Sequence, residues 1–264
     1  CLVGSEMCIR DSPIQINGKL QKRSKGVPQG SPLSPLLSNI MLDELDKLLA
    51  ARGHRYIRYA DDFSIYLRSK KAARRVGNGV YLFLKNNMHL PINSEKSGIR
   101  RPTKFVTLGH GFVPTYRTGE KGKYQLVVKH SRWKELKRKL KHLTKKTLPM
   151  SFDERINRIK LLQEGWINYF QMASMHSKLK QLDEWLRNRL RYCIWHDWKK
   201  PDRKRKNLIR LGKDPDIAYA WSRSRMGGWR IAQSPILGTT ITIKRLEKRG
   251  YESMVSYYHK ERSS

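Results

Sequence analysis

The stretch YIRYADDFSIYL at residues 56–67 decides how the first part of this sequence folds. Two runs rich in β-branched and aromatic residues, 56–60 and 63–67, flank the pair Asp61–Asp62. Such runs around a short polar break are typical of a β-hairpin, so we expect the two acids at its turn. Paired Asp residues also occur at solvated turns without function. Because adjacent strand side chains point to opposite faces, the two acids become equivalent ligands only if the turn brings them together.

Apolar spacing predicts the elements that surround this hairpin. Apolar residues recur at helical spacing over Leu33–Leu49, and Gly53 supplies a stop, so we predict a helix there. We predict one further helix at 70–88 and three short strands at 90–93, 105–112 and 123–128. Residues Thr118–Gly122 are typical of a turn between the last two strands.

The pattern changes after about residue 130. Apolar residues follow helical spacing over Trp133–Leu143, Ile156–Tyr169 and Leu179–Cys193. This pattern predicts three amphipathic helices that pack together. We place the basic cluster at 203–206 between helices, and we assign no topology after residue 214.

The chain is strongly basic. Its 264 residues include 56 Lys and Arg against 22 Asp and Glu, a net charge of +34. Residues 1–112 hold 19 basic against 8 acidic residues and residues 113–264 hold 37 against 14, so the second part carries most of the excess. A polyanionic partner, most commonly nucleic acid, explains such a charge. Hydrophobic residues make up 38% of the chain, which excludes a disordered basic tail.

Several protein classes are excluded by composition. The three cysteines, Cys1, Cys8 and Cys193, form no Cys-x-x-Cys pair, which excludes a disulfide framework and argues against a structural zinc site. No apolar run approaches the ~20 residues of a membrane span, and no signal-peptide pattern opens the chain. We therefore expect no membrane partner and a cytoplasmic location, in a bacterial cytoplasm or nucleoid, with an organelle as the alternative.

Two motifs of the first part resemble a known family. The sequences GVPQGSPLSPLL at 26–37 and RYADDF at 58–63 resemble motifs B and C of reverse transcriptases. The resemblance implies that Asp61 and Asp62 are catalytic residues that bind two Mg²⁺ ions. It also implies a pocket for the incoming nucleotide and its template base, lined by Pro28, Gln29 and Gly30.

Two further segments extend this resemblance. LPINSEKS at 90–97 is similar to the next palm motif, which implies that Lys96 assists proton transfer to pyrophosphate; an ordinary surface lysine is the equal alternative. LGHGF at 108–112 is similar to the primer-grip hairpin, which implies that Leu108 and Gly109 belong to the primer grip, although Thr107 replaces the usual Phe. We interpret His110 as structural, because no second His, Cys or acid has a suitable spacing.

The second part narrows the family. The sequences GWINYF at 165–170, LDEWLR at 182–187 and WRIAQSPIL at 229–237 resemble the maturase or thumb domain of group II intron proteins. The implied fold is α+β: a partial reverse-transcriptase palm with an antiparallel sheet and helices at 13–128, then an α-helical thumb/maturase region at 129–264. We interpret residues 1–12 as an anomalous leader or sequence junction. The basic face implied to bind RNA consists of Arg132, Lys134, Lys137, Arg138 and Lys141.

The resemblance implies an RNA-directed DNA polymerase and splicing maturase of a group II intron. Its partners would be intron RNA, template RNA, a DNA primer and dNTPs, and a homodimer stays open. Nothing before residue 26 resembles motif A, whose aspartate completes the metal site. We therefore expect this chain to be N-terminally truncated and inactive alone in primer extension.

Three alternatives remain beside this interpretation. A non-catalytic maturase would bind and fold intron RNA, but RNA folding does not require the intact Asp61–Asp62 pair. A retron or diversity-generating reverse transcriptase is disfavoured by the Pro28–Gly30 sequence and by the thumb signature. A generic basic RNA-binding protein would need both polymerase motifs to arise by chance at the expected spacing.

Overall fold

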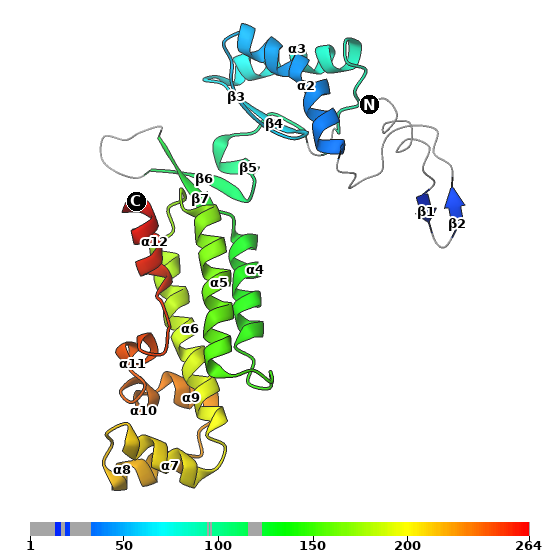
Figure 1. The fold of residues 1–264 in the computed structure, drawn as a ribbon. Helices are drawn as coiled ribbons and strands as arrows, with labels where there is room; N and C mark the ends of the chain where they lie inside the picture. The colour runs from blue at the N-terminus through cyan, green and yellow to red at the C-terminus, as the bar shows by residue number, and fades with distance from the viewer. Residues whose placement is uncertain are drawn as a thin grey trace. The chain divides into compact units, whose positions relative to one another are not determined.

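The structure, a computed structural model, describes residues 14–16, 19–21, 33–93, 95, 97–115 and 123–263. The chain divides into two compact units, residues 1–99 and 100–264, and each has its own hydrophobic core. Small antiparallel sheets and many helices make the fold α+β, which confirms the predicted class (Figure 1). The domain border at 128/129 stays a prediction; by compactness, the strands after residue 100 group with the helices that follow.

Among its described residues, the first unit combines two helices with two antiparallel strand pairs. Its elements are β1 (Ile14–Ile16), β2 (Lys19–Gln21), α2 (Ser34–Ala51), β3 (Arg55–Tyr59), β4 (Asp62–Tyr66) and α3 (Lys70–Asn86). Strands β3 and β4 pair antiparallel, with Tyr59 opposite Asp62, so the predicted hairpin is confirmed. Both predicted helices are also confirmed, and α3 continues through Gly77 and Gly79.

The core of the first unit lies between α2 and α3. Leu45 and Leu49 of α2 pack with Val76, Val80 and Leu84 of α3, which are spaced four residues apart and so share one helix face. Ser69 caps α3, because its side chain accepts a hydrogen bond from the Ala72 amide. The apolar stripe of α2 is only partly buried, since Leu36 and Ile40 lie exposed.

The second unit begins with a three-stranded antiparallel sheet. The short helix η1 (Pro102–Lys104) precedes β5 (Val106–Thr107), β6 (His110–Pro114) and β7 (Tyr124–Val128), which lie in the order β5-β6-β7. The prediction of a strand at 90–93 is wrong, because this segment is irregular. Pro91 lacks the amide hydrogen that a strand ladder needs. The predicted turn at Thr118–Gly122 lies outside the described residues.

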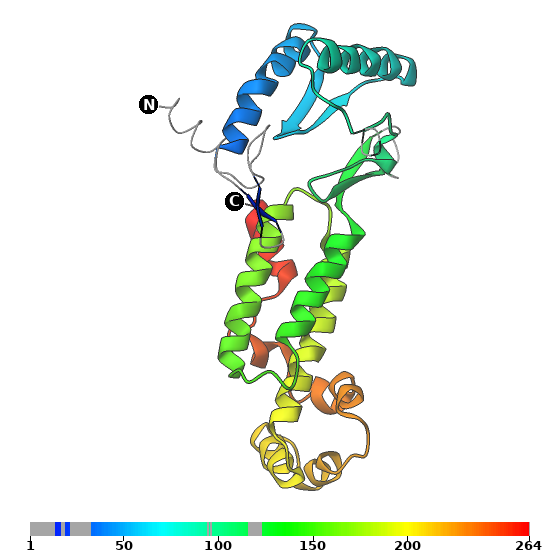
Figure 2. The ribbon, with the colours of Figure 1, turned by 90° about the vertical axis from the view of Figure 1, so that its right-hand side faces the viewer.

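A helical bundle forms the largest core. Helices α4 (His130–Leu143), α5 (Phe152–Phe170) and α6 (His176–Asp197) run side by side and confirm the three predicted helices (Figures 1 and 2). Helix α12 (Met254–Ser263) packs along α5 and α6. Fully buried residues such as Leu136, Ile159, Leu186 and Tyr258 fill the space between them.

The remaining helices are short. They are α7 (Pro201–Arg210), α8 (Pro215–Ser222), α9 (Gly228–Gln233), α10 (Pro235–Gly238) and α11 (Ile243–Glu247). The placement of the basic cluster 203–206 between helices is wrong, because it lies inside α7. Pro201 and Asp202 in the first turn favour a helix start, and Lys and Arg are good helix formers. Across the described part of the chain, no helix combines the length and apolar character that crossing a bilayer requires.

Candidate active site and nucleic-acid interface

The structure places Asp61 and Asp62 at the tip of the β3–β4 hairpin. Ala60 and Asp61 form a two-residue turn, and Asp62 begins β4. Ala60 has a φ of +52°, a left-handed conformation that costs an L residue about 1–2 kcal/mol. Both carboxylates are exposed, and neither has a hydrogen-bond or ion-pair partner in the described part of the chain. The turn therefore presents two free acids to solvent.

The two free carboxylates fit part of a divalent-cation site. Their oxygens are the ligands that Mg²⁺ prefers, and no protein donor competes for them within the described residues. No group of three or more His, Cys, Asp or Glu gathers into a metal cluster in the part of the chain that the structure describes. The predicted pocket residues Pro28, Gln29 and Gly30, and also Lys96, lie outside the described residues.

Arg58, a residue of β3, contacts both the hairpin tip and α2. Its Nη1 donates to the Ala60 carbonyl over 3.1 Å and to Asn39 Oδ1 over 2.8 Å. Its Nε lies 3.0 and 2.9 Å from the two carboxylate oxygens of Asp46. One guanidinium therefore connects α2 to the peptide that precedes Asp61.

The predicted primer-grip residues form a second two-residue turn. Leu108 and Gly109 join β5 to β6 with φ values of +49° and +82°, as a type I′ hairpin turn requires. The Tyr169 hydroxyl of α5 donates to the Leu108 carbonyl over 3.1 Å, and the Lys129 amide donates to the Gly109 carbonyl over 2.9 Å. The main chain of this turn is thus fixed to the start of α4 and the end of α5.

His110 follows this turn and packs between aromatic rings. Its ring centroid lies 6.0 Å from that of Tyr169 and 4.9 Å from that of Phe170. Burial lowers the pKa of His110 below its usual value, which favours the neutral ring. These contacts suit the packing role that we expected for this histidine.

The five predicted RNA-binding residues are all exposed on α4, but they do not share one face. Lys134, Lys137, Arg138 and Lys141 follow helical spacing and form one stripe. Arg132 lies on another side, where its Nη1 is 3.0 Å from a carboxylate oxygen of Glu135. We call the first four residues the α4 stripe. Four positive side chains in a row suit the phosphate backbone of a nucleic acid.

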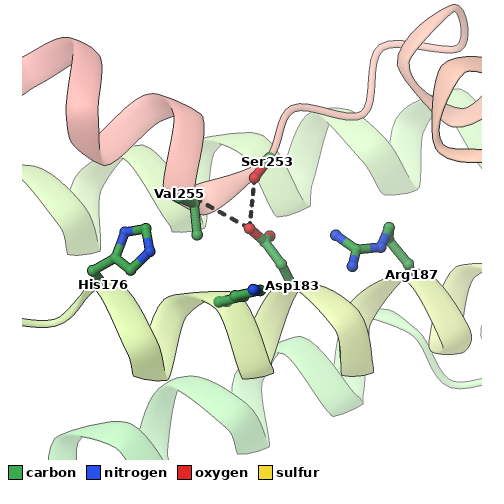
Figure 3. A pocket seen from close by; sticks show the side chains of 6 residues that line it. His176, Asp183, Arg187, Ser253 and Val255 are labelled. Atoms are coloured by element: carbon green, nitrogen blue, oxygen red, sulfur yellow. Dashed lines mark hydrogen bonds between the residues drawn. The ribbon is translucent and has the colours of Figure 1, made fainter.

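A pocket between α6 and the start of α12 contains the acid of the LDEWLR sequence. Figure 3 shows Asp183 on α6, between His176 and Arg187, with Ser253 and Val255 facing it. The buried Asp183 carboxylate accepts hydrogen bonds from two hydroxyls and two amides, those of Tyr251 (2.9 Å), Ser253 (2.6 Å), Met254 (3.0 Å) and Val255 (3.1 Å). Burial and the nearby Asp183 charge raise the pKa of Tyr251, so its hydroxyl keeps the proton that it donates. Asp183 therefore caps α12, and its oxygens are already occupied.

Comparison with protein families covers both units. Residues 4–112 match the family model for the reverse transcriptase (RNA-dependent DNA polymerase). Residues 133–212 match the model for the group II intron, maturase-specific domain. The chain therefore resembles the reverse transcriptase/maturase proteins of group II introns. The Asp61–Asp62 and Leu108–Gly109 turns both lie within the reverse transcriptase match, and the α4 stripe lies within the maturase match.

Three curated proteins are similar to this chain. Protein YkfC of Escherichia coli (strain K12) is 32% identical over 134 residues, covering 36% of this chain and 34% of that protein. The putative COX1/OXI3 intron 2 protein of Saccharomyces cerevisiae is 25% identical over 186 residues (46% and 22%). The Retron Ec86 reverse transcriptase of Escherichia coli is 26% identical over 121 residues (44% and 35%). The chain thus spans about a third or less of the length of these relatives.

The sequence analysis assigned no role to two residues that the structure places at the turns, Arg58 and Tyr169. Arg58 carried a usable signal, because strand alternation puts it on the inward side of β3 together with Tyr56. An inward arginine needs a partner to offset its desolvation. Tyr169 carried no signal, because its partner is a main-chain carbonyl 61 residues away in the sequence.

Proposed function

We propose that this chain is part of an RNA-directed DNA polymerase that also acts as a splicing maturase for a group II intron. The proposal depends mainly on one observation: two exposed carboxylates, unpartnered among the described residues, on a strained hairpin turn in a chain that also matches a maturase-specific domain. Two-residue hairpin turns favour a positive φ, but this conformation is costly for a residue other than glycine or asparagine, and strain of this kind is common at functional sites.

Each site residue would have a distinct role in primer extension. Asp61 and Asp62 would hold two Mg²⁺ ions, which supply activation of the primer 3′-hydroxyl and stabilisation of the leaving pyrophosphate. Pro28, Gln29 and Gly30 would line the pocket for the dNTP and its template base. Lys96 would assist proton transfer to pyrophosphate.

The second unit would hold the nucleic acids. The Leu108–Gly109 turn, fixed by Tyr169, would contact the primer near its 3′ end. The α4 stripe and Arg132 would contact phosphates of the intron RNA or of the template–primer duplex. Because only two acids of the proposed metal site are found together in the described residues, we propose that polymerisation needs a third carboxylate from the segment N-terminal to motif B.

Replacement of Asp61 by Asn tests the polymerase proposal. The variant is made in a full-length protein in which this chain supplies the Asp61–Asp62 turn of the reverse transcriptase domain, and Mg²⁺-dependent extension of a DNA primer on an RNA template is measured. Changing groups that only orient metal ligands costs about 10–100-fold in metal affinity or activity, so loss of a direct ligand should reduce extension by at least about 100-fold. Binding of intron RNA, measured on the same samples, should not change.

Asp43→Asn is the matched control. Asp43 is an exposed acid of the same unit, and within the described residues its ion-pair partner is Lys47, four residues further along α2. This variant should keep both activities. RNA binding without any primer extension by the unaltered protein would favour the non-catalytic maturase instead.

A further inference from the structure

Arg58 uses its whole guanidinium group to connect three parts of the first unit. Nε and Nη2 contact the Asp46 carboxylate, with Nη2 2.5 Å from Oδ2, while Nη1 reaches both Asn39 and the Ala60 carbonyl. Asn39 and Asp46 lie two helical turns apart on one face of α2. The guanidinium therefore connects α2 to the end of β3.

The Arg58–Asp46 pair is too well enclosed to be an ordinary surface ion pair. The two side chains are only 14% and 23% exposed. Exposed ion pairs contribute little, because water and salt screen them. A two-pronged arginine–carboxylate contact that is largely shielded from water is stronger and fixes orientation as well as distance. The contact with Asp46 thus fixes the position of the Arg58 guanidinium, which can then fix a further group through Nη1.

The group that Arg58 holds is the strained peptide beside the metal-binding acids. Ala60 has its φ at +52°, and its carbonyl accepts the Nη1 hydrogen bond. This carbonyl belongs to the peptide that links Ala60 to Asp61. A left-handed non-glycine residue persists only where its surroundings enforce it. The hydrogen bond from Arg58 is such a constraint, applied one bond away from the Asp61 backbone.

The other end of the contact lies on the helix that continues motif B. The motif B segment spans residues 26–37, and α2 begins at Ser34 within it. Arg58 therefore joins the helix that follows the proposed nucleotide pocket to the turn that would hold the metal ions.

We propose that Arg58 is a positioning residue, which holds the Asp61–Asp62 turn in a metal-binding geometry by anchoring the Ala60 carbonyl to α2. This inference rests on the proposed function of the turn. Arg58 does not touch the metal or the substrate; it acts through the backbone of the turn. Loss of Arg58 should therefore weaken cation binding while the two carboxylates remain in place.

The first test measures Mn²⁺ binding to the 264-residue chain by electron paramagnetic resonance of the free ion. Binding by the Asp61→Asn variant gives the background. Groups that orient metal ligands typically change metal affinity by 10–100-fold, so Arg58→Gln should weaken the site-specific binding by about 10-fold. Arg58→Lys should recover part of the affinity, because it keeps the charge but loses the forked geometry.

Arg55→Gln is the matched control. Arg55 lies on the same strand and is exposed, and its side chain forms no hydrogen bond or ion pair with the described residues. This variant should bind Mn²⁺ like the unaltered chain. Circular dichroism at the same temperature confirms that each variant is folded, and Asn39→Ala, which removes one neutral anchor, is used if Arg58→Gln unfolds. It should weaken binding in the same direction by a smaller factor.

The outcomes separate the two claims. Equal Mn²⁺ affinity of the unaltered chain and a folded Arg58→Gln or Asn39→Ala variant would contradict the positioning role alone. Equal binding by the unaltered chain and Asp61→Asn would contradict the metal site itself, and the inference with it. In a polymerising protein that contains this chain, Arg58→Gln should raise the Mg²⁺ concentration for half-maximal extension by about 10-fold.

Discussion

At the scale of single residues, the surroundings of an acid decide its role more than the motif that contains it. Asp61 and Asp183 both lie in sequences that resemble the family. Asp61 is exposed and unpartnered in the described part of the chain, whereas Asp183 is 1% exposed and accepts four hydrogen bonds. An acid with free oxygens can bind a cation, but an acid with occupied oxygens holds the fold together.

We predict that Asp183→Asn destabilises the second unit by about 3 kcal/mol, because charge-assisted hydrogen bonds weaken and the new amide group faces a donor. Chemical denaturation followed by tryptophan fluorescence measures the change. Glu184→Gln is the control, since Glu184 is the next residue of α6 and is exposed. A similar stability for both variants would show that Asp183 does not cap α12 as described.

At the scale of elements, a helix helps to fix each of the two hairpin turns. Arg58 of β3, which is paired with Asp46 of α2, donates to the Ala60 carbonyl, and Tyr169 of α5 donates to the Leu108 carbonyl. Gly109 also fits closely, because an added Cβ would lie 3.2 Å from Arg132 Nε and 3.3 Å from Phe170 Cε1. The Leu108–Gly109 turn is therefore held by both hydrogen bonding and packing.

We predict that Gly109→Ala destabilises the second unit more than Gly212→Ala, which places alanine in a left-handed conformation without crowding it. The left-handed conformation costs alanine about 1–2 kcal/mol, and overpacking against Arg132 and Phe170 adds about 1–3 kcal/mol. Gly212→Ala is the control, because Gly212 has a φ of +85° and no atom within 4 Å of its would-be Cβ. Thermal unfolding measures both variants. Equal losses would mean that the turn does not pack against α4 and α5.

The same elements show what the sequence could predict. Strand alternation and the Asp pair predicted the β3–β4 hairpin, and apolar spacing predicted α4, α5 and α6, because these signals are local. The irregular segment at 90–93 was predicted wrongly, since its apolar residues outweighed Pro91. The contacts of Tyr169 and Asp183 could not be predicted, because they join segments 61 or more residues apart.

At the scale of the whole molecule, the chain builds two separate cores. Leu45 and Leu49 belong to the core of the first unit, whereas Leu136 and Leu186 belong to that of the second. All seven tryptophans, at 133, 166, 185, 195, 198, 221 and 229, fall in the second unit. Tryptophan fluorescence therefore reports on the second unit, while far-ultraviolet circular dichroism reports on helices of both.

We predict that Leu45→Ala destabilises only the first unit. Leu45 is fully buried, and removal of such a side chain costs about 2–5 kcal/mol. The part of the circular dichroism transition that comes from the first unit should move to a lower denaturant concentration. The transition followed by tryptophan fluorescence should keep its midpoint. Leu186→Ala, at an equally buried position in the second unit, should instead shift the tryptophan transition. If Leu45→Ala moved the tryptophan midpoint as far as Leu186→Ala does, the two cores would unfold as one. The turn that we propose binds metal and the basic helices would then share a single stability. A variant that unfolds one of them would also unfold the other, and both proposed activities would be lost together.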